Sequence, residues 1–288
     1  MTRPFRFPLI LLLILLWLAS GCTAYTLREA QDSFNKAAEI ELRALDRSLR
    51  TDNPEASPSD AMAALNSYRL ADSAVTKLIT TDSRTLKEDN LLGAAYVLKA
   101  MALWRISDLE AVQPSEVERP GDTQPVAGGK PFGTRQELLA LLGTIEQLRA
   151  NHEIMLGTRD LVLFRALYGF YDHDGGRAES DFAKARVWFQ SADRRLKESL
   201  AGVPPQHPVQ VYVGSARLRT LAAWNQALYV GKRSSADPQV VRQDQRTINE
   251  TAREVYCGLR SFWETNADVK KSLAQLLAAI GLPSMSCE

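Results

Sequence analysis

The fold is decided by residues 91–106, which read LLGAAYVLKAMALWRI. Alanine and leucine fill this stretch together with Tyr96, Met101 and Trp104, whereas β-branched residues, which are typical of strands, are few. The composition therefore favours a helix that is apolar on nearly every side. Such a helix has to be covered by other helices. We expect it to span residues 86–112 and to lie at the centre of a helical body.

The spacing of the prolines extends this interpretation to the rest of the chain. No proline occurs in residues 59–113, 132–203 or 209–237. Because proline breaks helix interiors, these gaps leave room for long helices. The sequence predicts an all-α fold, either a solenoid of antiparallel helix pairs or a helical bundle. The expected helices cover residues 27–50, 58–80, 86–112, 135–151, 158–172, 179–201, 209–231, 238–264 and 267–281.

Several helix starts have recognisable capping residues. Thr26, Thr85 and Thr134 are each followed three residues later by glutamate, the pattern of a capping box. Ser57-Pro58 and Asp237-Pro238 fit an N-cap followed by proline in the first helical position.

One segment and one loop allow more than one interpretation. Residues 209–213, VQVYV, alternate as in a strand, but no partner strand lies nearby, so we favour a helix start. Residues 113–133 are rich in proline and glycine. They form a linker between two halves, a loop that contacts a partner, or an insertion without consequence, which is the alternative we favour.

The expected organisation has four parts. A signal peptide over residues 1–21 precedes an N-terminal helical part over 22–113. The loop or linker over 114–134 separates it from a C-terminal helical part over 135–288. We expect the two helical parts to form one continuous body.

The N-terminus predicts export. Arg3 and Arg6 precede a run of ten apolar residues, 9–18, which is too short to cross a bilayer and is typical of a signal peptide. The sequence Ala19-Ser20-Gly21-Cys22 that follows resembles the lipobox of bacterial lipoproteins, although Ala19 stands where leucine is usual. An ordinary secretory signal and a single-pass anchor are the alternatives.

The lipobox resemblance implies cleavage before Cys22 and acylation of that residue. By the sorting rule of enteric lipoproteins, Thr23 in place of aspartate implies the outer membrane, with the body facing the periplasm. The removed segment holds two arginines and no acid. The remaining 267 residues therefore carry 33 basic and 34 acidic side chains, and this balance argues against a nucleic-acid partner.

Three short patterns resemble parts of the tetratricopeptide repeat. Two sets, Ala30, Phe34, Ala37 and Ala185, Phe189, Ala192, are similar to its second helix, and Leu92-Gly93 with Tyr96 is similar to its first. The likeness covers about 25 residues and no unit contains both halves. It implies a degenerate, TPR-like helical-repeat body in which small residues let helices approach closely.

The mature chain keeps two cysteines, Cys257 and Cys287. In the oxidising periplasm we favour a disulfide between them over two free thiols. It would close a loop of about 31 residues and tie the C-terminal tail to the preceding helix.

No catalytic or cofactor motif is present in the sequence, and the cysteines are not spaced for zinc. We expect no enzyme activity, no cofactor and no metal. The one cluster that resembles a site, Asp172-His173-Asp174, is expected to be a turn between helices, with a metal or catalytic site as the alternative. Aromatic residues offer a candidate binding surface, which comprises Phe164, Tyr168, Tyr171 and Trp188.

Three functions fit these features. The favoured one is a non-enzymatic helical scaffold or accessory factor, anchored by lipid at Cys22 and bound to another envelope protein. The second is a ligand-binding accessory of a solute or lipid transport system, with a small molecule held between helices. The third is an envelope hydrolase that uses Asp172, His173 and Asp174.

Overall fold

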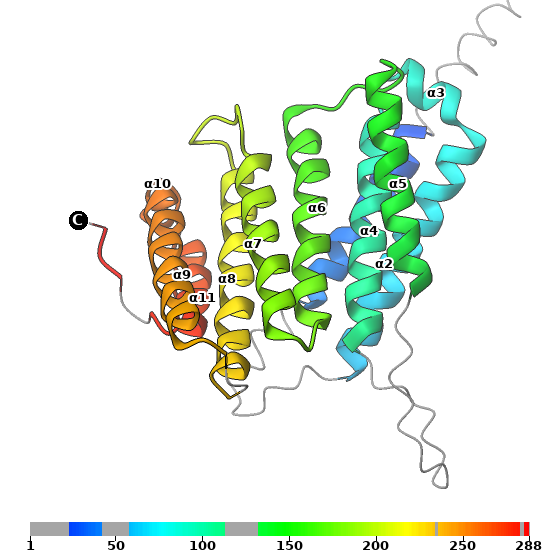
Figure 1. Ribbon diagram of the computed structural model, residues 1–288. Helices are drawn as coiled ribbons and strands as arrows, with labels where there is room; N and C mark the ends of the chain where they lie inside the picture. The colour runs from blue at the N-terminus through cyan, green and yellow to red at the C-terminus, as the bar shows by residue number, and fades with distance from the viewer. Residues whose placement is uncertain (1–22, 42–57, 113–131, 234–235, 283–284, 288) are drawn as a thin grey trace, which may run out of the picture. The chain divides into compact units, whose positions relative to one another are not determined.

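The computed structural model describes residues 23–41, 58–112, 132–233, 236–282 and 285–287, and it confirms the all-α prediction (Figure 1). No strand occurs in these residues. The chain divides into two compact units, Met1–Gly157 and Thr158–Glu288. No helix of the described residues is long and apolar enough to cross a membrane.

The boundary between the units differs from the expected one. It falls at residue 157, whereas the sequence placed the division at the loop over 114–134. The reason is that α5 (Phe132–Ala150) packs against α4 (Leu92–Val112) and so belongs to the first unit. The expected loop lies mostly outside the described residues, and α5 begins at its C-terminal end.

The first unit is built around α4, as residues 91–106 predict. A helix over residues 23–41, α2 (Pro58–Thr81), α3 (Ser83–Glu88) and α5 make up the rest of its described part, and α4 packs against α2, α3 and α5. Side chains from several sides of α4 are buried, namely Leu92, Ala95, Val97, Ala100, Met101, Ala102, Leu103, Trp104 and Ile106. Because neighbours cover the helix on several sides, it needs no polar face.

The sequence predicted a single helix over 86–112, but the structure has two helices there, α3 and α4. The predicted start of the helix was therefore wrong. The chain turns between α3 and α4 at Asn90, whose φ of 57° is in the left-handed region. Asparagine tolerates this conformation better than most residues because its short polar side chain can bond locally. The amide of Leu91 then donates to the carbonyl of Leu86 at 2.7 Å, which closes the turn.

The prediction that three threonines cap helices was also wrong. Thr26, Thr85 and Thr134 all lie inside helices that begin two or more residues earlier. The Thr134 hydroxyl donates to Glu110 at 3.2 Å and so bonds to the neighbouring helix α4. By contrast, Asp237 caps α9 (Pro238–Gly258) as expected, because its side chain accepts from the amide of Gln239 at 2.8 Å.

The second unit consists of successive helix pairs. Its elements are α6 (Thr158–Ala178), α7 (Phe182–Ser199), α8 (Val209–Arg233), α9, α10 (Arg260–Trp263) and α11 (Ala267–Ile280). α6 packs on α7, α7 on α8, and α8 on both α9 and α11 (Figure 1). The alternating segment 209–213 is the first turn of α8, as we favoured. The expected helix over 238–264 is interrupted at Leu259, which separates α9 from α10.

Small residues set the close approach of α6 and α7. A Cβ added to Gly176 would lie 2.7 Å from the ring of Phe189, and one added to Gly169 would lie 2.7 Å from the side chain of Leu196. Ala185, Phe189 and Ala192 are all buried. The aromatic ring therefore occupies the space that the missing side chain of Gly176 leaves.

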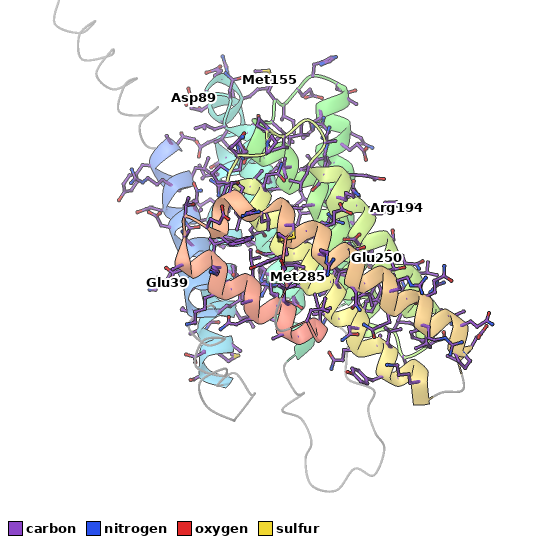
Figure 2. The ribbon with its side chains drawn as sticks, turned by 90° about the vertical axis from the view of Figure 1, so that its left-hand side faces the viewer. Glu39, Asp89, Met155, Arg194, Glu250 and Met285 are labelled. Carbon is purple, nitrogen blue, oxygen red and sulfur yellow. A yellow bond between two sulfur atoms is a disulfide. The ribbon has the colours of Figure 1, made fainter. Side chains whose placement is uncertain are left out.

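A disulfide joins Cys257 and Cys287, with the two Cα atoms 5.5 Å apart. This is the pairing that we favoured over two free thiols. Leu282, Met285 and Cys287 pack against the core of the second unit (Figure 2). The bond therefore fixes residues 285–287, which have no regular secondary structure, to the end of α9.

Candidate functional site

The cluster of Asp172, His173 and Asp174 lies inside α6, so the expected interhelical turn was wrong. Adjacent residues on a helix point in different directions, and the three side chains do not form one group. Asp172 is buried, where its carboxylate accepts from Ser191 at 2.7 Å and forms an ion pair with Arg195 at 3.0 Å. These contacts make Asp172 a link between α6 and α7. Among the described residues, no three histidines, cysteines or acids gather as metal ligands would.

The four aromatic residues of the expected binding surface form two separate pairs. Phe164 is buried and meets Tyr168 edge to face, with the ring centroids 5.8 Å apart. The guanidinium of Arg195 covers the Tyr168 ring at 5.5 Å. Tyr171 and Trp188 form the second pair at 6.3 Å, which packs α6 against α7. None of the four lines the pocket described next.

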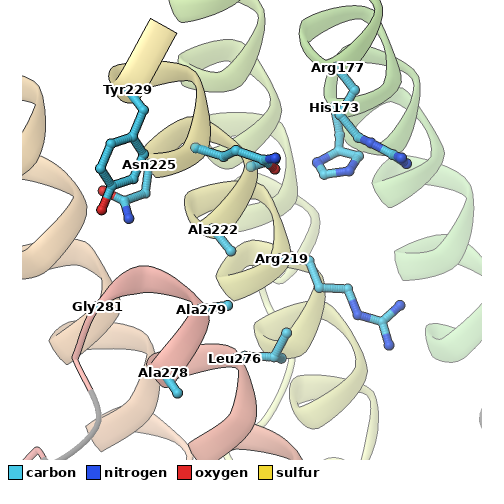
Figure 3. Close-up of a pocket in the computed structure, with 12 residues that line it drawn as sticks. His173, Arg177, Arg219, Ala222, Asn225, Tyr229, Leu276, Ala278, Ala279 and Gly281 are labelled. Carbon is cyan, nitrogen blue, oxygen red and sulfur yellow. The ribbon is translucent and has the colours of Figure 1, made fainter. Parts of the chain in front are cut away.

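The second unit contains a pocket of about 420 Å³ on α6, α8 and α11 (Figure 3). Its volume lies within the range of roughly 300–1,000 Å³ that is usual for ligand sites. Ala222 and Ala223 of α8 and Leu276 of α11 give it apolar walls. The two alanine side chains are short and Leu276 is half-buried, so these residues form the floor of the pocket between longer side chains of the lining.

One end of the pocket is cationic. His173 and Arg177 come from successive turns of α6, and Arg219 lies on the side of α8 that faces them (Figure 3). The imidazole Nδ1 of His173 lies 3.2 Å from the hydroxyl of Thr220, which fixes the ring against α8. No aspartate or glutamate is among the described residues that line the pocket.

The other end of the pocket is amphipathic. Asn225, Tyr229 and the last turn of α11 form it (Figure 3). The buried amide of Asn225 donates to the carbonyl of Ile280 at 3.1 Å and so joins α8 to the C-terminus of α11. Gly281 ends α11 with a φ of 86°, a conformation that strains residues with a Cβ. The ring of Tyr229 is 59% exposed and can therefore contact a ligand.

The first unit holds a polar network with a structural role. The Tyr68 hydroxyl donates to Glu41 at 2.6 Å, and Arg105 bonds to Glu41 and pairs with Asp108 at 2.7 Å. Burial, reinforced by the nearby Glu41 carboxylate, raises the pKa of Tyr68. Burial opposes the charge of Arg105, but Asp108 and Glu41 outweigh it and raise the pKa of the guanidinium. The network joins the helix over 23–41 to α2 and α4.

Arg177, Arg219 and Tyr229 were not predicted from the sequence as site residues. Helical spacing could have indicated part of this set. His173 and Arg177 are four residues apart and lie on one face of α6. One face of α8 likewise holds Arg219, Ala222, Ala223 and Gln226. Helical spacing could not show that this face of α6 and this face of α8 lie next to each other. Cys22 lies outside the described residues, and the disulfide cysteines do not line the pocket.

Comparison of the chain with protein-family models, with curated proteins and with solved structures finds no match. The fold, the pocket and the residues that line it are therefore the basis for the function proposed below.

Proposed function

We propose that this protein is a lipoprotein of the bacterial outer membrane whose helical body faces the periplasm and docks another envelope protein without enzymatic activity. The observation that carries the proposal is the pocket on α6, α8 and α11. These helices belong to successive layers of the second unit, since α6 pairs with α7 and α8 with α9. Stacked helix pairs commonly present such surfaces to partner proteins.

The lipid anchor rests on the lipobox-like sequence before Cys22. Residues 23–41 are helical, so the folded first unit begins directly after the acylated residue. A body attached in this way suits a partner that lies at the same membrane.

The contacts of Asp172 support a non-enzymatic role. Its carboxylate is bound by Arg195 and Ser191, and Asp172 is not among the residues that line the pocket. The packing of Gly176 on Phe189, flanked by Ala185 and Ala192, supports a TPR-like helix pair at α6 and α7.

Site-directed photocrosslinking in the native membrane tests the docking role. A photoreactive amino acid at Gln226, which is exposed in the pocket, should capture a distinct envelope protein. The same amino acid at Arg194, exposed on α7 outside the pocket, is the matched control (Figure 2). If the two positions give the same crosslinked products, or if neither position gives a product, the scaffold proposal is wrong.

The anchor is tested separately by labelling with a palmitate analogue. Wild type should incorporate the label and sediment with membranes. The Cys22→Ala variant should lose the label and be released from the membrane fraction, because two or three acyl chains are what hold such a protein stably. A Cys22→Ala variant that still carries the label would contradict acylation at this residue.

A second candidate function is ligand binding for a transport system. It is favoured by the pocket volume, which would accommodate a small molecule. Native mass spectrometry of protein purified from membranes would show a constant mass increment that is lost after denaturation. Without such an increment, docking of a protein remains the function that the pocket supports best.

A further inference from the structure

We infer that one end of the first unit rests on the lipid bilayer, with the side chains of Tyr25 and Met155 inserted among the lipid headgroups. This end, which we call the anchor end, is formed by the start of the helix over 23–41, the turn between α3 and α4, and residues 151–156. The inference rests on the proposed acylation of Cys22 and adds a second, apolar contact with the same membrane.

The three parts of the anchor end lie at the same end of the first unit. Figures 1 and 2 both show the start of the helix over 23–41 at the end where α3 turns into α4 and where the chain passes from α5 to α6. Asp89 and Met155 are labelled at this end in Figure 2. An ion pair between Lys87 and Glu153, at 3.5 Å, joins α3 to the segment after α5.

Tyr25 is held close to the membrane by its position in the chain. It lies in the first turn of the helix that begins at Thr23, three residues after Cys22. Three residues span at most about 11 Å, so acylation of Cys22 brings Tyr25 to the level of the lipid headgroups. The Tyr25 side chain is 64% exposed. Tyrosine is enriched at this depth because its ring is apolar and its hydroxyl is polar.

Met155 is the second apolar side chain at the anchor end, and its backbone is fixed. A Cβ added to Gly93 at the start of α4 would clash with the carbonyl oxygen of Met155, so the segment after α5 packs closely on α4. The preceding Ile154 is buried, whereas Met155 is 70% exposed, the highest value among the described large apolar side chains. An unbranched, flexible methionine adapts readily to an irregular apolar environment. A lipid surface would therefore cover an exposed side chain that the fold holds in place.

The charges of α3 do not form a basic patch that would attract anionic lipid. Arg84 pairs with Glu88 at 2.9 Å, and Lys87 pairs with Glu153. The contact should therefore depend on apolar burial and not on anionic headgroups. A protein partner is the other occupant to consider. Acylation of Cys22 favours lipid, because it brings the bilayer to this end whether or not a partner is present.

Fluorescence of the acylated full chain in phosphatidylcholine vesicles tests the inference. The Met155→Cys variant carries an environment-sensitive dye on its thiol, and the labelling is selective because Cys257 and Cys287 form a disulfide and Cys22 is acylated. The matched control is Leu70→Cys, which replaces an apolar side chain that is 65% exposed within α2. Lipid with a nitroxide near its headgroup should quench the dye of Met155→Cys about twofold and leave that of Leu70→Cys unchanged.

A second comparison tests the two side chains themselves. The dye is placed on Asp89→Cys, at the anchor end, and its quenching should fall by about half when Tyr25→Ser and Met155→Ser are combined, since less apolar surface enters the bilayer. The control, Met62→Ser with Leu70→Ser, removes two exposed apolar side chains from α2 and should leave the quenching unchanged. Equal effects of the two double substitutions would overturn the inference.

Labelling with the palmitate analogue, applied to the same preparations, separates this inference from the proposed anchor. If Cys22 is labelled but the dyes of Met155→Cys and Leu70→Cys are quenched equally, the inference is overturned and the anchor stands. If Cys22 is not labelled, the anchor is wrong and the inference falls with it.

The composition of the membrane decides between the remaining occupants. Quenching of the Met155→Cys dye that requires about 30% phosphatidylglycerol would show attraction by charge in place of apolar insertion. Shielding of the dye in native membranes but not in pure lipid would assign the anchor end to a protein partner. Either result would overturn the inference.

Discussion

At Gly176 the backbone of α6 lies against the ring of Phe189, and any Cβ would come within 2.7 Å of it. The ring is only 1% exposed and cannot move aside freely. We therefore expect Gly176→Ala to destabilise the second unit by about 1–3 kcal/mol, the usual cost of overpacking. Urea denaturation followed by circular dichroism measures the loss.

The control for this substitution is Gly258→Ala. Gly258 is exposed in the last turn of α9, and no atom lies within 4 Å of a Cβ built there. Alanine should be neutral or stabilise the helix by up to about 1 kcal/mol, since glycine loses more backbone entropy on folding. A Gly176→Ala protein as stable as Gly258→Ala would mean that α6 and α7 pack less closely than described.

The ion pair of Glu254 leads to a prediction about how stability depends on pH. A hydrogen bond from Lys197 at 3.0 Å lowers its pKa below the ordinary 4.5, and Arg217 adds to the shift against partial burial. A lowered pKa in the folded state means that the pair stabilises the protein above about pH 4.5 and that this contribution is lost as the pH falls. Because the Glu254 side chain is 54% exposed, the contribution stays below about 1 kcal/mol.

The measurement is the free energy of unfolding between pH 3 and pH 7. Glu254→Gln should be less stable than wild type at pH 7 and approach it at pH 3. Glu198→Gln removes the same charge from an exposed site of α7 that has no ion pair with a described residue, and it should follow wild type throughout. A constant difference between Glu254→Gln and wild type at all pH values would contradict the pairing.

At the scale of elements, the disulfide holds the tail after α11 against α9. Cys257 and Cys287 are 30 residues apart, and in the chain-entropy model such a crosslink stabilises by about 3–4 kcal/mol. We expect Cys257→Ser with Cys287→Ser to lower the free energy of unfolding by about that amount. Addition of a reductant should destabilise wild type similarly and leave the double variant unchanged, and a reductant effect on the variant would point to a different cause.

The elements also show where local sequence rules fail. Thr26, Thr85 and Thr134 satisfy the capping-box spacing, yet each lies inside a helix. A cap is worth about 1 kcal/mol, and packing of a further helical turn can outweigh it. Asp237 succeeds as a cap because Pro238, without an N–H to donate, fits the first position of a helix better than its interior.

At the scale of the whole molecule, each unit has its own core. In the second unit the core includes Phe189, Leu221, Trp224, Ile248 and Leu277, all on helices that follow residue 157. We therefore expect the fragment of residues 158–288 to fold by itself when its disulfide is formed. Helical circular dichroism with a cooperative urea transition would show this, whereas a fragment that is unfolded in buffer would contradict the division.

The amino-acid sequence by itself determined the helical class, the central place of residues 91–106 and most helix positions, because periodicity and proline placement act over short distances. It also predicted the disulfide between Cys257 and Cys287, because these are the two cysteines of the mature chain. Only the tertiary structure decided the division at residue 157 and brought His173 and Arg177 of α6 next to Arg219 of α8. Such a pocket depends on which helix faces pack together, and this follows from side-chain packing between segments that lie far apart in the chain.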